Sequence, residues 1–547
     1  MAETGALEHS REIRTKMGQV HGGRLVARAL RRHGVDAVFT LCGIHIQAIY
    51  DGCIDEGIRL LDTRHEQTAG FAADALARIT GRPGVSLVTA GPGVTNSITA
   101  VANAQRAGVP MICIGGAGPR SLADMGSLQD IDSVRLMSPV TKWAAQIPET
   151  RRIQEYVDSA FRIAQAGLPG PVYLEAPLDL LMASAGDEPP LTSPLAPARP
   201  GCDPESVERA ARLLEAAERP CFIVGSQLRW SSRQTILERV TQHLQLPFYL
   251  NGLARGALEP THPSLFSHSR RHALERSDLV FVLGTPLDFR VGYGRAPLWN
   301  PDARVIQVDI DAAQLGHNRT LDLAVHADVG LFLESLIERA AKKRTPHWLE
   351  ELDGVELARK ASLRAEMESG ANPPTALRVC HELAKRLGSD SVVIGDGGDF
   401  VASVAQALTL TWPQLWLDAG PLGTLGVGPG FALAASIARP RARSVIVSGD
   451  GAFGFSALEF EALARHRLPV VAVIGNDAAW TQVRRGQIQI YGKERAVATS
   501  LEHTRYEQVV QAVGGKGFWV ERVEELGPAL DGAFAADVPS CVNVRLG

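Results

Sequence analysis

Side chains that carry oxygen follow two consecutive strand-like segments in the last third of the chain. The apolar segment SVIVS leads into Gly449-Asp450-Gly451, and the next one, PVVAVIG, leads into Asn476-Asp477. A right-handed crossover makes two such strands parallel, so these residues are expected at the same edge of one sheet. Mg²⁺ takes oxygen ligands and keeps phosphate oxygens in its shell, and glycine lets a phosphate approach the backbone closely. The spacing therefore predicts a magnesium–diphosphate site at this edge.

A second acid, Glu66, stands at the predicted start of a helix. The strand-like segment IRLLDT precedes it, and the helix is expected to run from His65 to Thr80 and to stop at Gly81. The helix dipole alone also favours a carboxylate in the first turn. Position by itself therefore leaves both a structural and a chemical role open for Glu66.

Strand-like and helix-like segments alternate in three blocks, which is typical of βαβ units. The predicted fold class is α/β, with three domains that each contain a parallel sheet. A segment rich in proline and small residues, 183–203, is predicted to be a linker, and the charged stretch 346–371 to be helical. Ser456-Ala-Leu-Glu459 is expected to form a capping box for a helix that ends near His466. The predicted domains are 19–183, 204–345 and 373–547.

The composition restricts partners and compartment. A chain of 547 residues is too long for one hydrophobic core, and its net charge of −4 favours neither a nucleic-acid nor an anionic-membrane partner. The seven cysteines show no C-x-x-C spacing, which argues against a disulfide framework or a zinc site and fits a reducing compartment. No run of eighteen apolar residues occurs, and the first eighteen residues read as a loose tail rather than a signal peptide. A cytoplasmic protein is expected.

The G-D-G sequence, followed about 25 residues later by Asn476-Asp477, resembles the metal–diphosphate motif of thiamine diphosphate (ThDP) enzymes. The resemblance implies that Asp450 and Asp477 bind Mg²⁺, with Asn476 as the alternative to Asp477 and the backbone carbonyl of Ala479 as a third ligand. Asp477 stands where Asn is usual, which keeps a side-chain oxygen and adds a negative charge. The residues beside Asp450 are then expected to contact the diphosphate: Gly449, Gly451 and Ala452.

Two further glycine-rich segments resemble cofactor-binding parts of the same family. GPLGTLGVGPGFALAAS (420–436) is similar to the segment that supports the bent cofactor, which implies that Leu425 lies between its two rings and that the carbonyl of Gly423 holds its amino group. GDGGDF (395–400) is similar to the loop on the other side of the diphosphate. That similarity nominates Gly398, Asp399 and Phe400.

Glu66 acquires a role through the same resemblance. The pattern R-H-E-x-x-A-x-x-A-A-D-x-x-A-R is similar to that of the family's pyrimidine-binding domain, in which a carboxyl group hydrogen-bonds the cofactor's pyrimidine ring and promotes its activation. In this family the first domain of one subunit faces the third domain of another. At least a homodimer, and often a homotetramer, with active sites between subunits is therefore implied.

The whole chain resembles the acetolactate synthase-like branch, with pyrimidine-binding, central and diphosphate-binding domains in that order. GPGVTNSITAVANAQ (91–105) and GSLQDID (126–132) are similar to segments that line the substrate side. LDFRVGYG (287–294) and GNDAAWTQ (475–482) are more similar to 2-hydroxyacyl-CoA lyases. The implied reaction is the reversible cleavage of a 2-hydroxyacyl-CoA to formyl-CoA and an aldehyde or ketone.

Three residues are candidates for contact with substrate, each beside a plainer interpretation. Trp480 is expected to bound the acyl pocket or simply to pack. His45, in LCGIHIQ, approaches the substrate or belongs to the core or surface. Gln129 hydrogen-bonds a substrate oxygen or does not take part.

The central domain of such relatives holds ADP, FAD or nothing. Asp309 and Ile310 in QVDID, with Arg162 before the GLPGPV strand, fit a nucleotide-contact pattern, and ADP is preferred to FAD. Related CoA-using enzymes often continue past the last strand as a lid over the thioester. This chain ends at CVNVRLG, so a lid is expected to be missing, shorter or removed.

Four other functions compete with the lyase. Acetolactate synthase would condense two pyruvates, and a benzaldehyde lyase-like carboligase would act without CoA. A non-catalytic protein with the same fold is disfavoured because Glu66 and Asp450 are intact. A Rossmann dehydrogenase is disfavoured because no G-x-G-x-x-G follows the first strand with an acid about twenty residues on.

Overall fold

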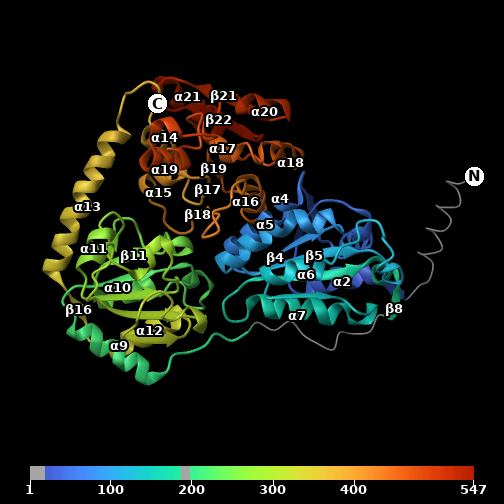
Figure 1. Ribbon diagram of the computed structural model, residues 1–547, viewed down its shortest axis with the longest axis horizontal. Helices are drawn as coiled ribbons and strands as arrows, with labels where there is room; N and C mark the ends of the chain where they lie inside the picture. Colours follow the sequence, from blue (N-terminus) through green and yellow to red (C-terminus); the bar gives the residue numbers. More distant parts are fainter. Residues whose placement is uncertain (1–18, 187–196) are drawn as a thin grey trace, which may run out of the picture. The chain divides into compact units, whose positions relative to one another are not determined.

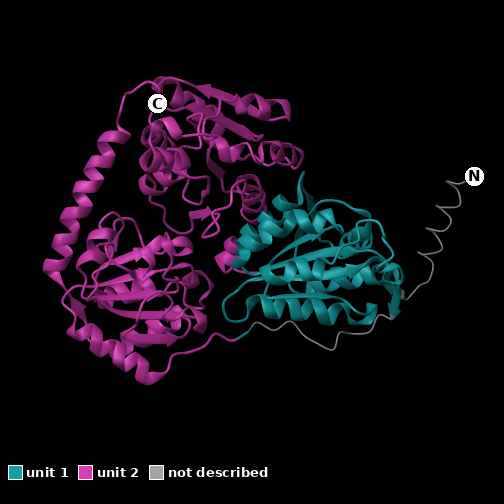
Figure 2. Cartoon of the chain, in the orientation of Figure 1, with its two compact units in different colours: residues 1–77, 83–105, 109–197 teal, residues 78–82, 106–108, 198–547 magenta. Residues whose placement is uncertain are grey.

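The computed structural model describes residues 19–186 and 197–547 (Figure 1). In this part of the chain there are three six-stranded sheets, in each of which neighbouring strands run parallel with helices beside them. The predicted α/β fold class is confirmed. The chain divides into two compact units (Figure 2). Unit 1 comprises residues 1–77, 83–105 and 109–197, and unit 2 comprises residues 78–82, 106–108 and 198–547.

Unit 1 is built on a sheet of order β3-β2-β4-β5-β7-β6. Its strands are β2 (Ala37–Thr40), β3 (Arg59–Asp62), β4 (Gly84–Val88), β5 (Met111–Ala117), β6 (Trp143–Gln146) and β7 (Pro171–Pro177). Its helices are α2 (Gly22–Arg32), α3 (Gln47–Asp55), α4 (Glu66–Thr80), α5 (Pro92–Ala107), α6 (Ser133–Met137), α7 (Ile153–Gln165) and α8 (Leu178–Met182).

The inner strands of this sheet are more buried than the two edge strands, β3 and β6. All residues of β2, β4 and β7 are buried, which is the pattern that a doubly covered parallel sheet requires. Helix α2 buries its apolar side and ends in Arg31 and Arg32, whose charges are favourable at a helix C-terminus.

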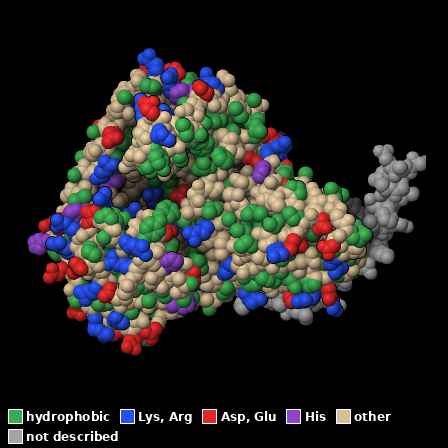
Figure 3. Space-filling view, viewed as in Figure 1, with side chains coloured by type: hydrophobic (Ala, Val, Ile, Leu, Met, Phe, Trp, Pro, Cys, Tyr) green, Lys and Arg blue, Asp and Glu red, His purple; other side chains and the backbone are tan. Residues whose placement is uncertain are grey.

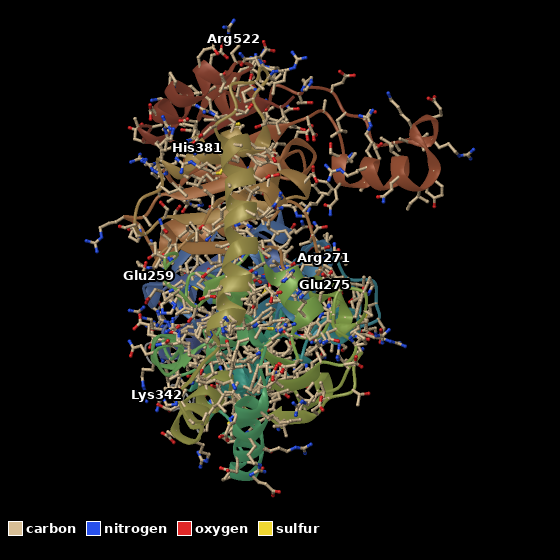
Figure 4. The ribbon with its side chains drawn as sticks, turned by 90° about the vertical axis from the view of Figure 1, so that its left-hand side faces the viewer. Glu259, Arg271, Glu275, Lys342, His381 and Arg522 are labelled. Atoms are coloured by element: carbon tan, nitrogen blue, oxygen red, sulfur yellow. The ribbon has the colours of Figure 1, made fainter. Side chains whose placement is uncertain are left out.

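The central part of unit 2 contains a sheet of order β12-β11-β9-β13-β14-β15. Its strands are β9 (Pro220–Val224), β11 (Phe248–Leu250), β12 (Leu265–Phe266), β13 (Leu279–Leu283), β14 (Arg304–Asp309) and β15 (Leu323–His326). The helices here are α9 (Pro204–Ala216), α10 (Leu237–His243), α11 (Arg270–Arg276), α12 (Val329–Arg339) and the long α13 (Pro346–Met367), which Figure 4 shows face on. The short strands β10 (Leu244–Gln245) and β16 (Lys343–Arg344) pair with each other.

The last part of unit 2 contains a sheet of order β18-β17-β19-β20-β22-β21. Its strands are β17 (Val392–Asp396), β18 (Leu415–Asp418), β19 (Ser444–Gly449), β20 (Val471–Asn476), β21 (Lys516–Val520) and β22 (Ser540–Arg545). Its helices are α14 (Ala376–Ala384), α15 (Asp399–Ala407), α16 (Gly428–Ala438), α17 (Asp450–Phe453), α18 (Phe460–Arg465), α19 (Thr481–Tyr491), α20 (Tyr506–Ala512) and α21 (Val523–Phe534).

The first and last sheets share one topology. When strands are numbered from the first in each sheet, both have the order 2-1-3-4-6-5, whereas the central sheet has the order 3-2-1-4-5-6 of dinucleotide-binding folds. In sheets of this kind, ligands bind at the carboxyl ends of the strands where the strand order reverses. In the first and last sheets, the first and third strands lie at that point.

Several local predictions can be compared with the structure. Helix α4 begins at Glu66 and ends at Thr80, and Gly81 has the positive φ of 75° that only glycine adopts easily, so this prediction is confirmed. The predicted capping box is wrong, because no side-chain hydrogen bond caps the 3₁₀ turn at Ser456 and α18 begins only at Phe460.

Part of the predicted linker is a strand. Residues Ser184–Gly186 form β8, which pairs antiparallel with β1 (Gln19–His21). Residues 187–196 of that linker, and the predicted tail, 1–18, lie outside the described residues.

None of the helices in the described part of the chain is both long and apolar enough to cross a membrane. On the face shown in Figure 3, basic and acidic side chains are interspersed, and neither sign forms a continuous field.

Candidate active site

Asp450 is a buried carboxyl group at the carboxyl edge of the last sheet. It follows β19 directly, opens α17 and is only 2% exposed. Its Oδ2 atom has no hydrogen-bond partner among the residues that the structure describes. Burial, together with the nearby charge of Asp477, raises the pKa of Asp450 to about 6. A bound cation would relieve both causes, so the observed environment fits a metal site.

The second half of the predicted metal motif lies beside Asp450. Strands β19 and β20 are parallel neighbours and Gly449 pairs with Gly475, so the expectation that both motif halves emerge at one edge is confirmed. Asp477 is half-buried, and its Oδ2 accepts a 2.5 Å hydrogen bond from the hydroxyl of Thr481. A hydrogen bond from the backbone of Ala479 reaches the Asp450 carboxyl and works against the rise in its pKa.

The side chain of Asn476 points into the protein rather than toward the edge. It is fully buried, and its amide nitrogen donates to the carbonyl of Thr504 and to Oδ1 of Asn543, both at 3.1 Å. Its Oδ1 accepts from the backbone amide of Ala478 at 3.3 Å and from His503 Nδ1 at 3.2 Å. With both polar atoms engaged, Asn476 is a poorer metal ligand than Asp477.

The donors available to a metal are therefore mixed. Within the described residues, no group of three or more His, Cys, Asp or Glu side chains is placed to hold a metal ion. Two carboxylates and the Ala479 carbonyl supply fewer ligands than an octahedral Mg²⁺ needs, and phosphate oxygens and water complete such shells. This donor set fits an ion that binds together with a diphosphate.

The loop after β17 lies beside the residues that follow the G-D-G turn and beside α19. A Cβ at Gly397, whose φ is 127°, would lie 3.1 Å from Cβ of Ala452, and a Cβ at Gly398 would lie 2.2 Å from Oε1 of Gln482. At Gly397 the positive φ itself disfavours a side chain, whereas at Gly398 a side chain would displace the flexible end of Gln482. The predicted cofactor residue Ala452 is thus packed directly against the 397–398 loop, and it is 3% exposed.

The side chains of Asp399 and Phe400 are engaged elsewhere. Both carboxylate oxygens of Asp399 accept from the guanidinium of Arg485, at 2.9 and 2.7 Å. The ring of Phe400 is buried, and a Cβ at Gly475 would lie 2.6 Å from it. The groups that remain for a phosphate are the backbone amides at the start of α15, where helix geometry leaves N–H groups unpaired.

A second buried acid, Asp396, accepts hydrogen bonds from the glycine-rich segment before α16. Asp396, at the end of β17, accepts hydrogen bonds from the amides of Gly426 at 2.9 Å and Gly428 at 2.8 Å. Burial raises its pKa to about 6. The two bonds fix the backbone on the C-terminal side of Leu425, which is half-buried, while Gly423 is exposed with a φ of 68°.

Trp480 lies over the G-D-G turn. A Cβ at Gly451 would stand 2.6 Å from the Trp480 ring, and the ring of Phe455 meets Trp480 edge-on at 6.2 Å between centroids. The two aromatic rings form an apolar wall beside Asp450. This geometry serves packing and a pocket boundary equally.

In unit 1, Glu66 is 7% exposed at the first position of α4. Its Oε2 accepts a 2.9 Å hydrogen bond from the amide nitrogen of Asn96 on α5. The sequence singled out segment 91–105 but not Asn96 itself. The bond fixes the orientation of the carboxyl group and leaves the other oxygen of Glu66 free of this partner.

His45 and Gln129 come together at the carboxyl edge of the unit 1 sheet. His45 is 3% exposed, and its Nδ1 lies 3.1 Å from the hydroxyl of Thr89. Burial lowers its pKa, opposed by a hydrogen bond to the backbone of Leu128, so the imidazole is mainly neutral near pH 7. Gln129 has a positive φ of 62°, and its carbonyl would be 2.7 Å from a Cβ at Gly91.

The residues predicted to contact a nucleotide are dispersed over the two units. Arg162, in unit 1, is exposed and donates to Ser159 at 3.3 Å. In unit 2, Asp309 is fully buried at the end of β14, where Oδ1 accepts from Gln227 at 2.7 Å. Its Oδ2 is unpartnered within the described chain, and burial raises its pKa to about 6. Ile310 donates its amide to Gln227 at 3.1 Å.

Three family models match successive parts of the chain. The thiamine pyrophosphate enzyme N-terminal TPP binding domain matches residues 20–136, the central domain residues 207–336, and the C-terminal TPP binding domain residues 396–544. The chain belongs to the thiamine pyrophosphate enzyme family. Thiamine pyrophosphate is another name for ThDP, so the predicted cofactor is confirmed at the level of the family.

Relatives of this thiamine pyrophosphate enzyme carry two kinds of name. A probable acetolactate synthase from Mycobacterium bovis is 39% identical, with 96% of this chain and 95% of the relative covered. A 2-hydroxyacyl-CoA lyase 2 from Danio rerio is 39% identical, with 92% and 87% covered, and the Homo sapiens protein of that name is 36% identical, with 92% and 86% covered. Both branches to which the sequence pointed are thus represented.

Sequence reasoning missed three polar residues of this thiamine pyrophosphate enzyme. Asn96 is recognisable only once α4 and α5 are packed together, and Asp396 is hidden inside the motif GDGGDF. His503 lies 27 positions from Asn476 and carries no motif. A signal existed for Asp396, because an acid at the end of an apolar strand is unusual unless something pairs with it.

Proposed function

We propose that this enzyme catalyses the reversible cleavage of a 2-hydroxyacyl-CoA to formyl-CoA and an aldehyde or ketone, with ThDP and Mg²⁺. The observation that carries the proposal is the segment 475–482, which resembles the lyases in sequence and contains both Asp477, whose charge acts on Asp450, and Trp480, whose ring lies beside Gly451. An apolar wall at this point suits an acyl chain. The lyase names of several relatives support the same choice.

The residues of unit 2 would hold the cofactor and its ion. Asp450, Asp477 and the Ala479 carbonyl would bind Mg²⁺, while the backbone at Gly398 and around Gly449 to Ala452 would bind the diphosphate. Leu425 would support the rings, and its position depends on the hydrogen bonds from Gly426 and Gly428 to Asp396. When bound, ThDP supplies a nucleophilic carbon and a sink for the electron pair released by carbon–carbon cleavage.

The residues of unit 1 would move protons. Glu66 would hold a proton between its carboxyl group and the pyrimidine ring, with Asn96 fixing the carboxyl orientation. His45 is buried and mainly neutral near pH 7, so it can accept or donate a proton at a substrate oxygen without carrying a permanent charge. Gln129 would orient that oxygen by hydrogen bonding.

The central domain would contribute surface for the CoA part and a nucleotide site. The segment 287–294 forms an irregular loop after β13, with Phe289 56% and Tyr293 48% exposed. Exposed aromatic rings beside a parallel sheet suit an adenine or a thioester arm. ADP is proposed at the end of β14, around Asp309 and Ile310, in preference to FAD.

We also propose that active sites form between subunits of a homodimer or homotetramer. Glu66 and Asp450 belong to separate compact units, and both are required for one catalytic centre. Multi-angle light scattering with and without ThDP checks this. A monomer that is fully active at all protein concentrations would overturn it.

Acetolactate synthesis is the second candidate, because a relative of that name is 39% identical over nearly the whole chain. The two reactions use the same cofactor site and differ in the acceptor and in the need for CoA. A carboligase without CoA would share the apolar wall but not the central-domain contacts.

The test offers the purified protein ThDP and Mg²⁺ with formyl-CoA plus an aldehyde or ketone, and separately with pyruvate. Mass spectrometry reads the products, and the Glu66→Gln variant serves as the inactive control. A 2-hydroxyacyl-CoA that the wild type makes and the variant does not supports the proposal. Acetolactate from pyruvate, with no CoA product, would move the enzyme to the synthase branch and leave the cofactor site intact.

A further inference from the structure

A chain of buried polar side chains lies directly behind the proposed metal turn. It begins at Asn476, continues through Asn543 on β22 and ends at Glu507 on α20, and His503 joins it from the loop before α20. Asn476 and Asn543 are 0% exposed and Glu507 is 2% exposed. Such groups are costly to bury, so the network must satisfy nearly all of their hydrogen bonds.

The hydrogen-bond directions in this network follow from its fixed end. The Glu507 carboxylate only accepts, so Asn543 turns its amide nitrogen toward Glu507 at 2.8 Å and toward the Thr504 carbonyl at 2.9 Å. Asn543 Oδ1 then accepts from Asn476 at 3.1 Å. That leaves the Asn476 oxygen facing the amide of Ala478 and Nδ1 of His503. His503 therefore carries a proton on Nδ1 and donates it.

At its Asn476 end, the network contacts a strained piece of backbone. Ala478 has a positive φ of 52°, which is unfavourable for a residue with a side chain and persists only where its surroundings impose it. Asn476 imposes it from one side through the Ala478 amide. On the other side, the Ala478 carbonyl accepts from Leu501 at 2.7 Å, and Ala479 forms a bridge with Ser500. Asp477 and Ala479, two of the three proposed metal ligands, flank this residue.

We propose that Asn476 and His503 are positioning residues, which hold the Asp477–Ala479 turn in the shape that binds the metal from behind the site. The proposal rests on the proposed function, since it assigns no new ligand but explains why the first residue of the Asn-Asp pair is an amide. An aspartate at 476 could not donate to Asn543 and Thr504. Glu507 and Asn543 set the direction of the Asn476 amide, and His503 donates to its oxygen and so adds to how firmly the turn is held.

The test compares His503→Phe with His503→Gln. Phenylalanine removes the donor, whereas glutamine keeps an N–H that can reach the Asn476 oxygen. His381→Phe on α14 (Figure 4) is the matched control, because His381 lies in the same domain outside the network. ThDP binding is measured by titration calorimetry at increasing Mg²⁺ concentrations, and the melting temperature is measured without cofactor.

His503→Phe is expected to raise the Mg²⁺ concentration needed for half-maximal ThDP binding by about 10-fold, as for residues that orient metal ligands. His503→Gln and His381→Phe are expected to stay within about 2-fold of wild type on the same scale. The melting temperature of the cofactor-free protein should be unchanged in all three, and kcat of His503→Phe should recover at saturating Mg²⁺.

Two results would overturn the inference. One is a Mg²⁺ requirement of His503→Phe equal to that of wild type. The other is an increase shared by His381→Phe or accompanied by a fall in the cofactor-free melting temperature, since that would indicate general destabilisation. Failure of the wild type itself to bind ThDP with Mg²⁺ would refute the proposed function instead.

Discussion

The first and last sheets have the same strand order but carry different chemistry at their carboxyl edges. After the second strand of each, unit 1 places Glu66 at the start of α4, whereas unit 2 places the glycine-rich segment that contains Leu425 before α16. After the third strand, unit 1 has Thr89, which contacts His45, whereas unit 2 has Asp450. One scaffold thus presents the proposed proton-transfer group in one copy and the proposed metal site in the other.

The difference lies in the connecting loops rather than in the strands. Strands β4 and β19 are both largely buried and lie at the same place in their sheets. The residues just after the two strands differ, because unit 1 has Thr89 beside a histidine and unit 2 has Asp450, a buried carboxyl group near a second one. Function therefore depends on a few residues at strand ends, which the scaffold holds in equivalent positions.

The largest effect on activity is expected from a substitution at Glu66, the proposed proton-transfer residue of unit 1. Glu66→Gln keeps the size and one oxygen but cannot exchange a proton, so kcat should fall by roughly 10²- to 10⁴-fold. ThDP binding and the melting temperature should stay close to wild type. Steady-state kinetics and calorimetry check this, with Glu149→Gln on the surface of unit 1 as the control. Near-normal turnover would remove Glu66 from cofactor activation.

Asp450→Ala removes a proposed metal ligand of unit 2 and is expected to weaken the binding of Mg²⁺ and ThDP. Mg²⁺-dependent ThDP affinity should fall by about 100-fold or more, since groups that only orient metal ligands already contribute roughly 10- to 100-fold. Asp309→Ala is the matched control, because Asp309 is also a buried acid whose pKa burial raises to about 6. Unchanged ThDP affinity of Asp450→Ala in calorimetry would exclude Asp450 as a ligand.

Asp396 sharpens the comparison because it is buried like Asp450 but fully paired with backbone amides. Its folded-state pKa of about 6 lies above the ordinary value of 3.8, so the folded protein binds the proton more tightly than the unfolded chain. Its contribution to stability is therefore greatest below about pH 4 and is lost as pH rises through about 6.

The corresponding experiment measures unfolding of wild type and Asp396→Asn without cofactor from pH 7 to pH 4. Relative to the variant, wild type should gain on the order of 2 kcal/mol on acidification, since one pKa unit corresponds to about 1.4 kcal/mol. Asp302→Asn, at an exposed position, is the control and should show no such difference. A pH-independent gap between wild type and Asp396→Asn would contradict the assignment.

The smallest effect is expected at the central sheet, whose strand order differs from the other two. Saturating ADP should raise the melting temperature by about 2–5 °C, as binding to the folded state alone predicts. Asp309→Ala should lose most of this shift while keeping ThDP binding. Thermal unfolding with ADP, FAD and no nucleotide distinguishes the cases, and a larger shift with FAD would reverse the preference for ADP.

The sequence by itself determined the cofactor class and predicted where the metal site lies. Apolar runs that end in G-D-G and Asn-Asp specify strand ends, and right-handed crossovers bring such ends to one edge whatever the rest of the chain does. The α/β class followed from the same alternation. Glu66 at the start of α4 could be placed because helix start and stop signals are local in sequence.

Only the tertiary structure decided which polar side chains form hydrogen bonds within the protein and which remain available to a cofactor or metal. Asn476 and Asp477 are adjacent in sequence, yet one points inward to Asn543 and the other lies beside Asp450. The carboxylate of Asp399 pairs with Arg485, which leaves the backbone of this residue for the predicted cofactor contact. A hydrogen bond between residues far apart in sequence depends on the packing of several elements at once, whereas a motif records only local spacing, so these assignments had to come from the fold.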